Sequence, residues 1–144
     1  MANKDFLLQL TAKLKEYLDQ IEEFKLVGEQ KFADDPRIYW MVDHGLHLAI
    51  QSCIDIAKEI IVILKLRKPR KYKEIFIILQ QKRIISHEVG DHMQELAEFH
   101  NRLIHEYLFM NPKEIYRIYT KKRIYLYRFA KDVVKWLKTQ KKSQ

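Results

Sequence analysis

Apolar residues recur along most of the chain at intervals of three and four, the spacing that places them on one face of an α-helix. A first helix is predicted over about 5–31, and the pair Asp35-Pro36 supplies a capping residue and a proline for the start of a second. This second helix has the clearest pattern and should lie at the centre of the core. Its apolar positions are Val42, Leu46, Ala49, Ile50, Cys53, Ile56, Ala57, Ile60, Ile61 and Leu64.

Three further helices are predicted after the long one. A short helix covers about 72–82, and the next begins after the capping residue Ser86. The last starts at Pro112, and its pattern leaves open a break near 120–123. The run 75–79 alone has the composition of a strand, but a lone strand has nothing to pair with.

The chain contains only three glycines and three prolines among its 144 residues. These are too few for the many tight turns of a β-sandwich or barrel. The sequence therefore predicts an all-α bundle of about five mostly antiparallel helices, forming a single domain over 1–144. The polar, basic tail 138–144 is expected to fray.

The formal net charge of +8 and the isoelectric point near 9.5 favour a polyanionic partner, because clustered cations release counterions from phosphates. Part of this basicity has a simpler explanation in the surface chemistry of heat-adapted proteins. The single cysteine, Cys53, excludes an intrachain disulfide. Since neither a signal peptide nor an apolar run of membrane-spanning length is found, we expect a cytoplasmic protein.

Polar side chains with useful chemistry are concentrated in 99–107, inside an otherwise apolar helix. At about 100° per residue, Asn101, Arg102 and His105 fall on one side of that helix. An imidazole can exchange protons with the ribose and the leaving oxygen of RNA, and a guanidinium can neutralise the phosphate. On spacing alone, a solvated face with an ordinary Glu98–Arg102 pair is the commoner explanation.

The segment 96–107, Leu-Ala-Glu-Phe-His-Asn-Arg-Leu-Ile-His-Glu-Tyr, resembles the signature helix of HepT-type HEPN proteins, roughly Met-Ala-x-Phe-Arg-Asn-x-Leu-Val-His-x-Tyr. Residues 49–57 are similar to the family's Ala-Ile-Glu-Ala-x-Ile-Asp-Ile-Ala helix, and 69–79 to its Pro-x-x-Tyr-x-x-x-Phe segment. The resemblance covers about 39–137, which is most of the chain.

This resemblance implies an all-helical HEPN fold, a homodimer that pairs two motifs across one cleft, and metal-independent RNA cleavage without a cofactor. It also implies a partner, a minimal nucleotidyltransferase antitoxin, which silences the toxin by adding AMP to the motif tyrosine. By position, His105 matches the catalytic histidine, Asn101 the polar residue after the arginine, and Tyr107 the modified tyrosine.

One position departs from the family pattern, because the arginine expected five residues before the histidine is His100. Three interpretations follow. Arg102 supplies the missing charge, or His100 joins His105 as an acid–base pair. In the third, the chain is a catalytically inactive interaction or substrate-binding subunit for the nucleotidyltransferase, since imidazole is a poor phosphate clamp.

Other candidate sites are weaker. A basic segment before the short helix is expected either to guide RNA or a partner, or to be a solvated loop; its cations are Lys65, Arg67, Lys68, Arg70, Lys71 and Lys73. His44 and His47 lie three apart, but no further ligand has a characteristic spacing, so no metal site is expected. Asp55 is expected to be buried and to support the core or the motif helix. No Gly-rich phosphate loop occurs.

Overall fold

The computed structural model describes residues 2–105 and 111–142, and within them the side chains of 4–102 and 111–140. These residues form six α-helices, a short 3-10 turn and no strand. The elements are α1 (Ala2–Ile21), η1 (Glu22–Phe24), α2 (Glu29–Asp34), α3 (Pro36–Ile63), α4 (Tyr72–Gln81), α5 (His87–His105) and α6 (Pro112–Lys142). None of the helices in the described part of the chain is long and apolar enough to cross a membrane.

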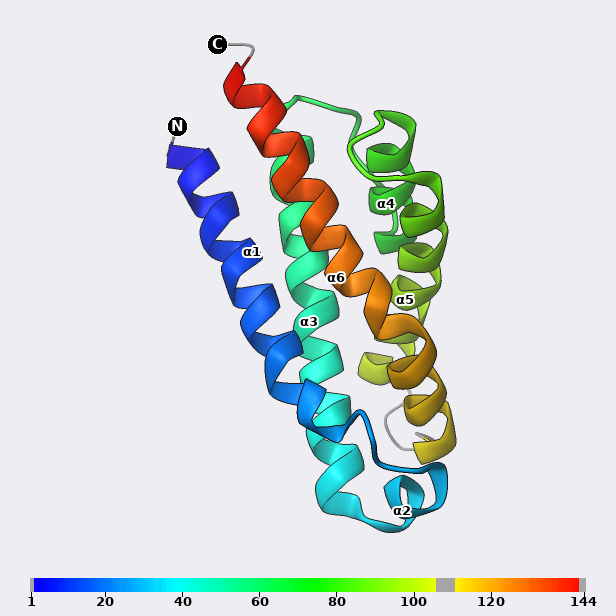
Figure 1. Ribbon diagram of the computed structural model, residues 1–144. Helices are drawn as coiled ribbons and strands as arrows, with labels where there is room; N and C mark the ends of the chain where they lie inside the picture. Colours follow the sequence, from blue (N-terminus) through cyan, green and yellow to red (C-terminus); the bar gives the residue numbers. More distant parts are fainter. Residues whose placement is uncertain (1, 106–110, 143–144) are drawn as a thin grey trace.

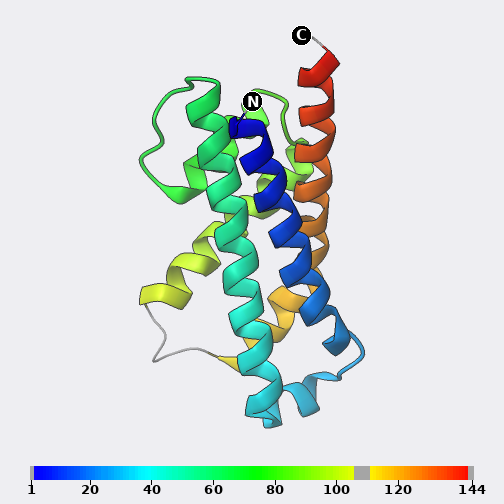
Figure 2. The same cartoon turned by 90° about the vertical axis from the view of Figure 1, so that its left-hand side faces the viewer.

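The three longest helices, α1, α3 and α6, lie side by side, and the pair α4 and α5 packs against them (Figures 1 and 2). Helices α1 and α5 run opposite to α3 and α6, while the short α2 closes one end (Figure 1). The start of α1 and the end of α6 lie at the other end of the bundle. The predicted all-α, mostly antiparallel bundle is therefore confirmed, with six helices in the described residues in place of about five.

Helix α3 forms the centre of the core, as its pattern predicted. Every apolar position of the predicted stripe from Val42 to Ile61 is buried, and only Leu64, just past the end of the helix, is partly exposed. Asp35 caps the start of α3, since its carboxylate accepts a hydrogen bond from the backbone N–H of Arg37 at 3.0 Å. Burial of this apolar face supplies most of the stabilisation of such a long helix.

The single first helix predicted over 5–31 is wrong in its second half. Helix α1 ends at Ile21, and the chain passes through η1 before α2 begins after Gly28. The reason is tertiary: the hydroxyl of Tyr119 in α6 donates to the Ile21 carbonyl, and Phe32 of α2 is fully buried among α6 tyrosines. These contacts outweigh the local periodicity.

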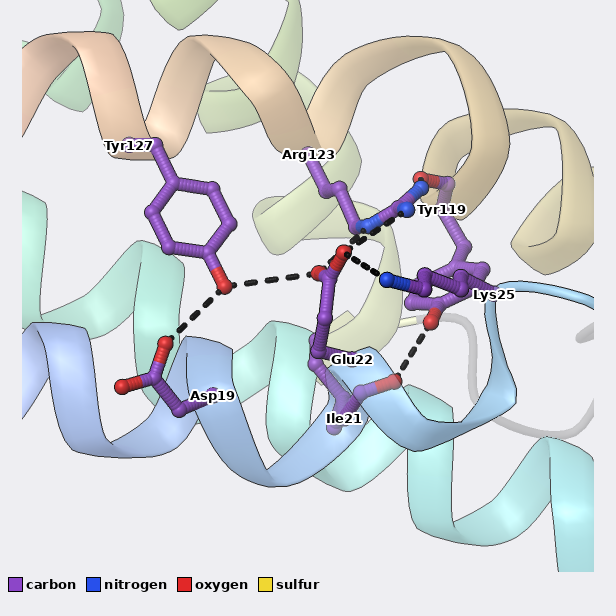
Figure 3. Close-up of polar contacts among 7 residues, drawn as sticks. All are labelled: Asp19, Ile21, Glu22, Lys25, Tyr119, Arg123 and Tyr127. Atoms are coloured by element: carbon purple, nitrogen blue, oxygen red, sulfur yellow. Dashed lines mark hydrogen bonds and ion pairs between the residues drawn. The ribbon is translucent and has the colours of Figure 1, made fainter.

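A polar cluster holds the end of α1 against α6 (Figure 3). Arg123 donates to both carboxylate oxygens of Glu22, at 3.0 and 3.3 Å. The hydroxyl of Tyr127 donates to Glu22 at 3.3 Å and to Asp19 at 3.2 Å. The guanidinium holds the pKa of Glu22 below its usual value, so this carboxylate stays charged and paired.

Helix α6 continues without interruption through 120–123, so the break left open by the sequence is absent. Tyr119 and Arg123 both face η1 and α1, and burial raises the pKa of Tyr119 to about 12. Since inward-facing residues continue on both sides of this segment, the helix has no reason to end there. The helix reaches Lys142, and fraying of 138–144 stays a prediction.

Two glycines allow helices to approach closely. A Cβ at Gly45 of α3 would lie 2.2 Å from Cγ2 of Ile21, and one at Gly90 of α5 would lie 2.7 Å from Cδ of Gln80. Both distances are far below van der Waals contact, so a larger residue would require the Ile21 or Gln80 side chain, or the helix that carries it, to shift. These positions therefore set the spacing of α1 against α3 and of α4 against α5.

Candidate functional site

His100 is fully buried, although it lies on the helix predicted to carry the chemistry. Its ring stacks on His47 of α3, with centroids 4.7 Å apart and planes 8° apart, and meets Tyr72 of α4 edge-on at 6.0 Å. Neither ring nitrogen has a hydrogen-bond partner among the described residues. His100 is thus a packing residue that joins α5 to α3 and α4.

The two stacked histidines are neutral near pH 7. Burial, with a smaller contribution from His47, lowers the pKa of His100 to about 4. Burial also lowers the pKa of His47. Burial disfavours the imidazolium because a charge loses solvation in the interior. At the position where the family pattern has an arginine, this chain therefore has an uncharged imidazole.

Arg102 lies on the outer side of α5 and forms an ion pair with Glu114 of α6. Its guanidinium carbon lies 5.8 Å from the centre of the Phe99 ring. The ordinary Glu98–Arg102 pair considered from spacing does not form, because Glu98 instead pairs with Lys73 of α4 at 3.0 Å. Arg102 and Glu98 thus pair with residues of the neighbouring helices α6 and α4, and not with each other.

Asn101 is exposed and helps to line a surface pocket of about 690 Å³ where the start of α4 meets α5. The pocket joins the predicted basic segment to the motif helix. Its lining residues are Arg70, Lys71, Tyr72, Lys73, Ala97, Glu98 and Asn101. Three cations, the Glu98 carboxylate that pairs with Lys73, and the amide of the motif therefore line one concave surface of net positive charge, which suits an anionic, polar ligand.

The remaining cations of the basic segment lie outside this pocket. Lys65 adopts a left-handed conformation (φ 54°) just past the end of α3. Arg67 forms an ion pair with Glu74, whose carboxylate also accepts the backbone N–H of Arg70 at 3.2 Å. Lys68 is exposed. The segment is thus a folded connection between two helices, fixed at Glu74.

His105 is the last residue of α5, and its side chain lies outside the described residues. Tyr107 lies outside them entirely. The predicted roles of the histidine and the tyrosine therefore stay predictions.

Sequence analysis missed two features of α3 that face this region. It considered His47 only as a metal ligand with His44, whereas the ring packs on His100. One turn earlier, Asp43 has a buried carboxylate oxygen with no hydrogen-bond partner in the described part of the chain, and burial raises its pKa to about 6. The available signal was that Asp43 and His47 lie four residues apart, and therefore on the same side of α3, next to the apolar stripe.

The expectation that Asp55 is buried is wrong. Its side chain is exposed and accepts a hydrogen bond from Nε2 of Gln51 at 2.9 Å. The residue lies on the edge of the apolar stripe, where helix rotation turns a position toward solvent. Its charge still acts on the site, because it slightly opposes the lowering of the His100 pKa.

The chain matches the family described as Ribonuclease HepT-like over residues 14–133. It is 27% identical over 94 residues to YutE of Bacillus subtilis (strain 168), a match that spans 65% of this chain and 65% of that relative. It is 25% identical over 107 residues to the mRNA nuclease HepT of Shewanella oneidensis, spanning 74% of this chain and 80% of the relative.

Solved structures share the fold. Bacillus subtilis YutE superposes with a TM-score of 0.83 at 20% identity, over 94% of this chain and 91% of that one. The tri-AMPylated Shewanella oneidensis HEPN toxin, solved in complex with MNT antitoxin, superposes with a TM-score of 0.80 at 22% identity, over 90% and 96% of the two chains. The family match covers every described side chain of the pocket at α4 and α5.

Proposed function

Because the chain belongs to the HepT-like ribonuclease family, we propose that it cleaves RNA at the end of α5. The observation that carries this proposal is the pocket that brings Arg70, Lys71 and Lys73 beside Asn101 of the motif. A strand of RNA held by these cations would have its phosphates next to the motif helix. Tyr72 also lines the pocket, and the ammonium of Lys58 lies 4.8 Å from the centre of its ring.

The proposed reaction needs no metal, because RNA carries its own nucleophile. The 2′-oxygen attacks the adjacent phosphorus while the bond from phosphorus to the 5′-oxygen breaks. One group takes the proton of the 2′-hydroxyl and another delivers a proton to the leaving 5′-oxygen, leaving a 2′,3′-cyclic phosphate and a 5′-hydroxyl. We assign one proton transfer to His105, and Asn101 is assigned to hold a phosphate oxygen.

Arg102 is proposed to neutralise the phosphate during this step. It is paired with Glu114, but both side chains are partly exposed, at 42% and 38%. Such a pair is worth only about 0–1 kcal/mol, so a phosphate can displace the glutamate. His100 is buried, and its proposed part is to position α5 through the stack on His47; direct proton transfer by His100 stays the less favoured prediction.

The proposal extends to two partners. A homodimer would supply a second His105, so that one histidine acts as base and the other as acid. A minimal nucleotidyltransferase antitoxin, with AMP added to Tyr107, is supported by the solved complex of the related HEPN toxin with its MNT antitoxin.

The alternative function is an interaction subunit that keeps the fold and does not cut. Two observations favour it: His100 is neutral and buried, and Arg102 is already paired. Within 96–102, the part of the motif whose side chains the structure describes, no free cation faces a phosphate until the pair with Glu114 opens.

The test is an RNA cleavage assay on the full chain in excess chelator, with analysis of the product ends. His105→Ala should lower the rate roughly 10²–10⁴-fold. Arg102→Ala should lower it more than His100→Ala does, while Lys121→Ala, at an exposed position of α6, serves as the matched control. Equal inactivity of wild type and His105→Ala on varied RNAs would establish the interaction subunit instead.

A further inference from the structure

A second concave surface, of about 610 Å³, lies between residues 8–18 of α1 and 127–138 of α6. Part of its lining is apolar or small, and includes Leu8, Ala12, Ala130 and Val134. Leu8 is 43% exposed, so its side chain is available at the surface of the groove. The groove shares no lining residue with the pocket at α4 and α5, so it is a separate site.

Four lysines line this groove, and the lining contains no acidic residue. Lys15 stands on α1, and Lys131, Lys135 and Lys138 form a row on α6 at steps of four and three residues. None of the four forms an ion pair within the described residues.

Four other cations on α6 are neutralised inside the fold, whereas Lys113 and Lys121 form no ion pair among the described residues. Arg117 and Lys122 pair with Glu95, Arg123 pairs with Glu22, and Arg128 pairs with Glu88. The row differs from these other unpaired lysines by its position, because its three members follow the apolar groove at steps of four and three residues. Unpaired like charges beside an apolar surface favour an occupant that is apolar on one side and acidic on the other.

The dimensions identify the class of occupant. From Leu8 to Leu18 the α1 wall is about 15 Å long, which equals roughly three helical turns. The lysine row from Lys131 to Lys138 spans about 10 Å, the separation of acidic residues placed at i, i+4 and i+7 on a helix. A fatty acid has its charge at one end only, so it does not match a row of charges along the groove.

We propose that the groove between α1 and α6 binds an amphipathic helix of another protein, with the apolar face of that helix on Leu8 and Ala130 and an acidic edge along the lysine row. The small side chains Ala12 and Ala130 let such a helix lie close to both walls. The bound helix would pack as a third helix over the exposed contact between α1 and α6. This binding is independent of RNA cleavage.

The probe is a fluorescein-labelled synthetic peptide of about 18 residues, long enough to form a helix, with leucines on one face and glutamates at i, i+4 and i+7 along its edge. Anisotropy is measured with the full chain at physiological salt, where weak surface attraction is screened. Two further peptides of the same length are compared, one with a scrambled order and one with lysine in place of glutamate. The expected result is saturable binding of the designed helix at micromolar concentrations and at least tenfold weaker binding of both others.

Charge reversal then tests the row itself. Lys131→Glu/Lys135→Glu should weaken binding of the acidic peptide at least about tenfold and should favour the lysine peptide. Lys121→Glu, an exposed change on the same helix away from the groove, is the matched control and should change binding less than about twofold. All three side chains are exposed, so the fold is retained; a circular dichroism melt checks this.

Five results would overturn the proposal. They are absence of peptide binding, equal binding of the scrambled peptide, and equal effects of the groove and control variants. The fourth is a different occupant: binding of phosphatidylglycerol vesicles without binding of the peptide assigns the surface to lipid. Likewise, self-association that Lys131→Glu/Lys135→Glu abolishes assigns it to a second copy of the chain.

Discussion

The buried imidazole of His100 gives a prediction about stability that can be measured without RNA. Its ring is 0% exposed, and both of its nitrogens lack a hydrogen-bond partner among the described residues. An unsatisfied buried polar group costs about 1–3 kcal/mol, whereas an apolar ring of similar shape carries no such penalty. His100→Phe, which can keep the stack on His47, is therefore expected to raise the free energy of unfolding by about 1–2 kcal/mol at pH 7.

The gain from His100→Phe should grow as the pH falls. The pKa of His100 is about 4 in the folded chain and 6.5 when unfolded, so between these values the unfolded chain binds more protons. Acid thus destabilises the wild type from pH 6.5 downward, with the full loss reached near pH 4. The fall of the pKa from 6.5 to about 4 corresponds to roughly 3 kcal/mol, and phenylalanine escapes this loss.

The assay is urea denaturation of both proteins at pH 7, 6, 5 and 4, since the other titrating groups are common to both and largely cancel in the difference. His44→Phe, at an exposed position of α3, is the matched control at pH 7 and should change stability by less than about 0.5 kcal/mol. A difference between His100→Phe and wild type that stays constant with pH would refute the reasoning. So would a loss of stability at pH 7 greater than about 1 kcal/mol.

Three further predictions concern the packing of the bundle, each measured by urea or thermal unfolding. Gly45→Ala should lower the free energy of unfolding by about 1–3 kcal/mol, because its Cβ would meet Cγ2 of Ile21. This loss should be smaller in an Ile21→Leu background, and equal losses in both backgrounds would contradict the reasoning. Lys65→Gly and Arg83→Gly, at positive φ, should each stabilise by about 1 kcal/mol, and no gain at either would count against backbone strain. Arg123→Ala should destabilise by about 2–4 kcal/mol, because the carboxylate of Glu22 would lose its guanidinium partner and keep only the Tyr127 hydroxyl and Lys25 (Figure 3). A change within about 0.5 kcal/mol would show that solvent replaces the lost pair.

The sequence predicted those features of the fold that are determined by residues close together in the chain. The stripe of α3 and the cap at Asp35 each follow from residues within a few positions of one another, so both appear in the structure as expected. The end of α1 at Ile21 depends on Tyr119, which lies 98 residues away in the sequence. No window of neighbouring residues contains that partner, and the prediction of one long first helix failed for this reason.

The candidate site likewise has features that the sequence could predict and features that depend on distant residues. Spacing placed Asn101 and Arg102 on an accessible side of α5, and the basic segment was identified from composition alone. The burial of His100 could not be predicted, because it depends on a ring from α3 and a ring from α4. The change of partner for Arg102, from Glu98 to Glu114, likewise depends on how α6 lies against α5.

The pairing of the first helix with the last has a consequence for how the protein is made. The bonds from Arg123 to Glu22 join residues 101 positions apart, and α6 covers the apolar faces of both α1 and α3. During synthesis these faces stay open to solvent until the final 31-residue helix has emerged from the ribosome. A message cut short before the codon for Pro112 would therefore yield a chain with an exposed core, which chaperones and proteases would remove.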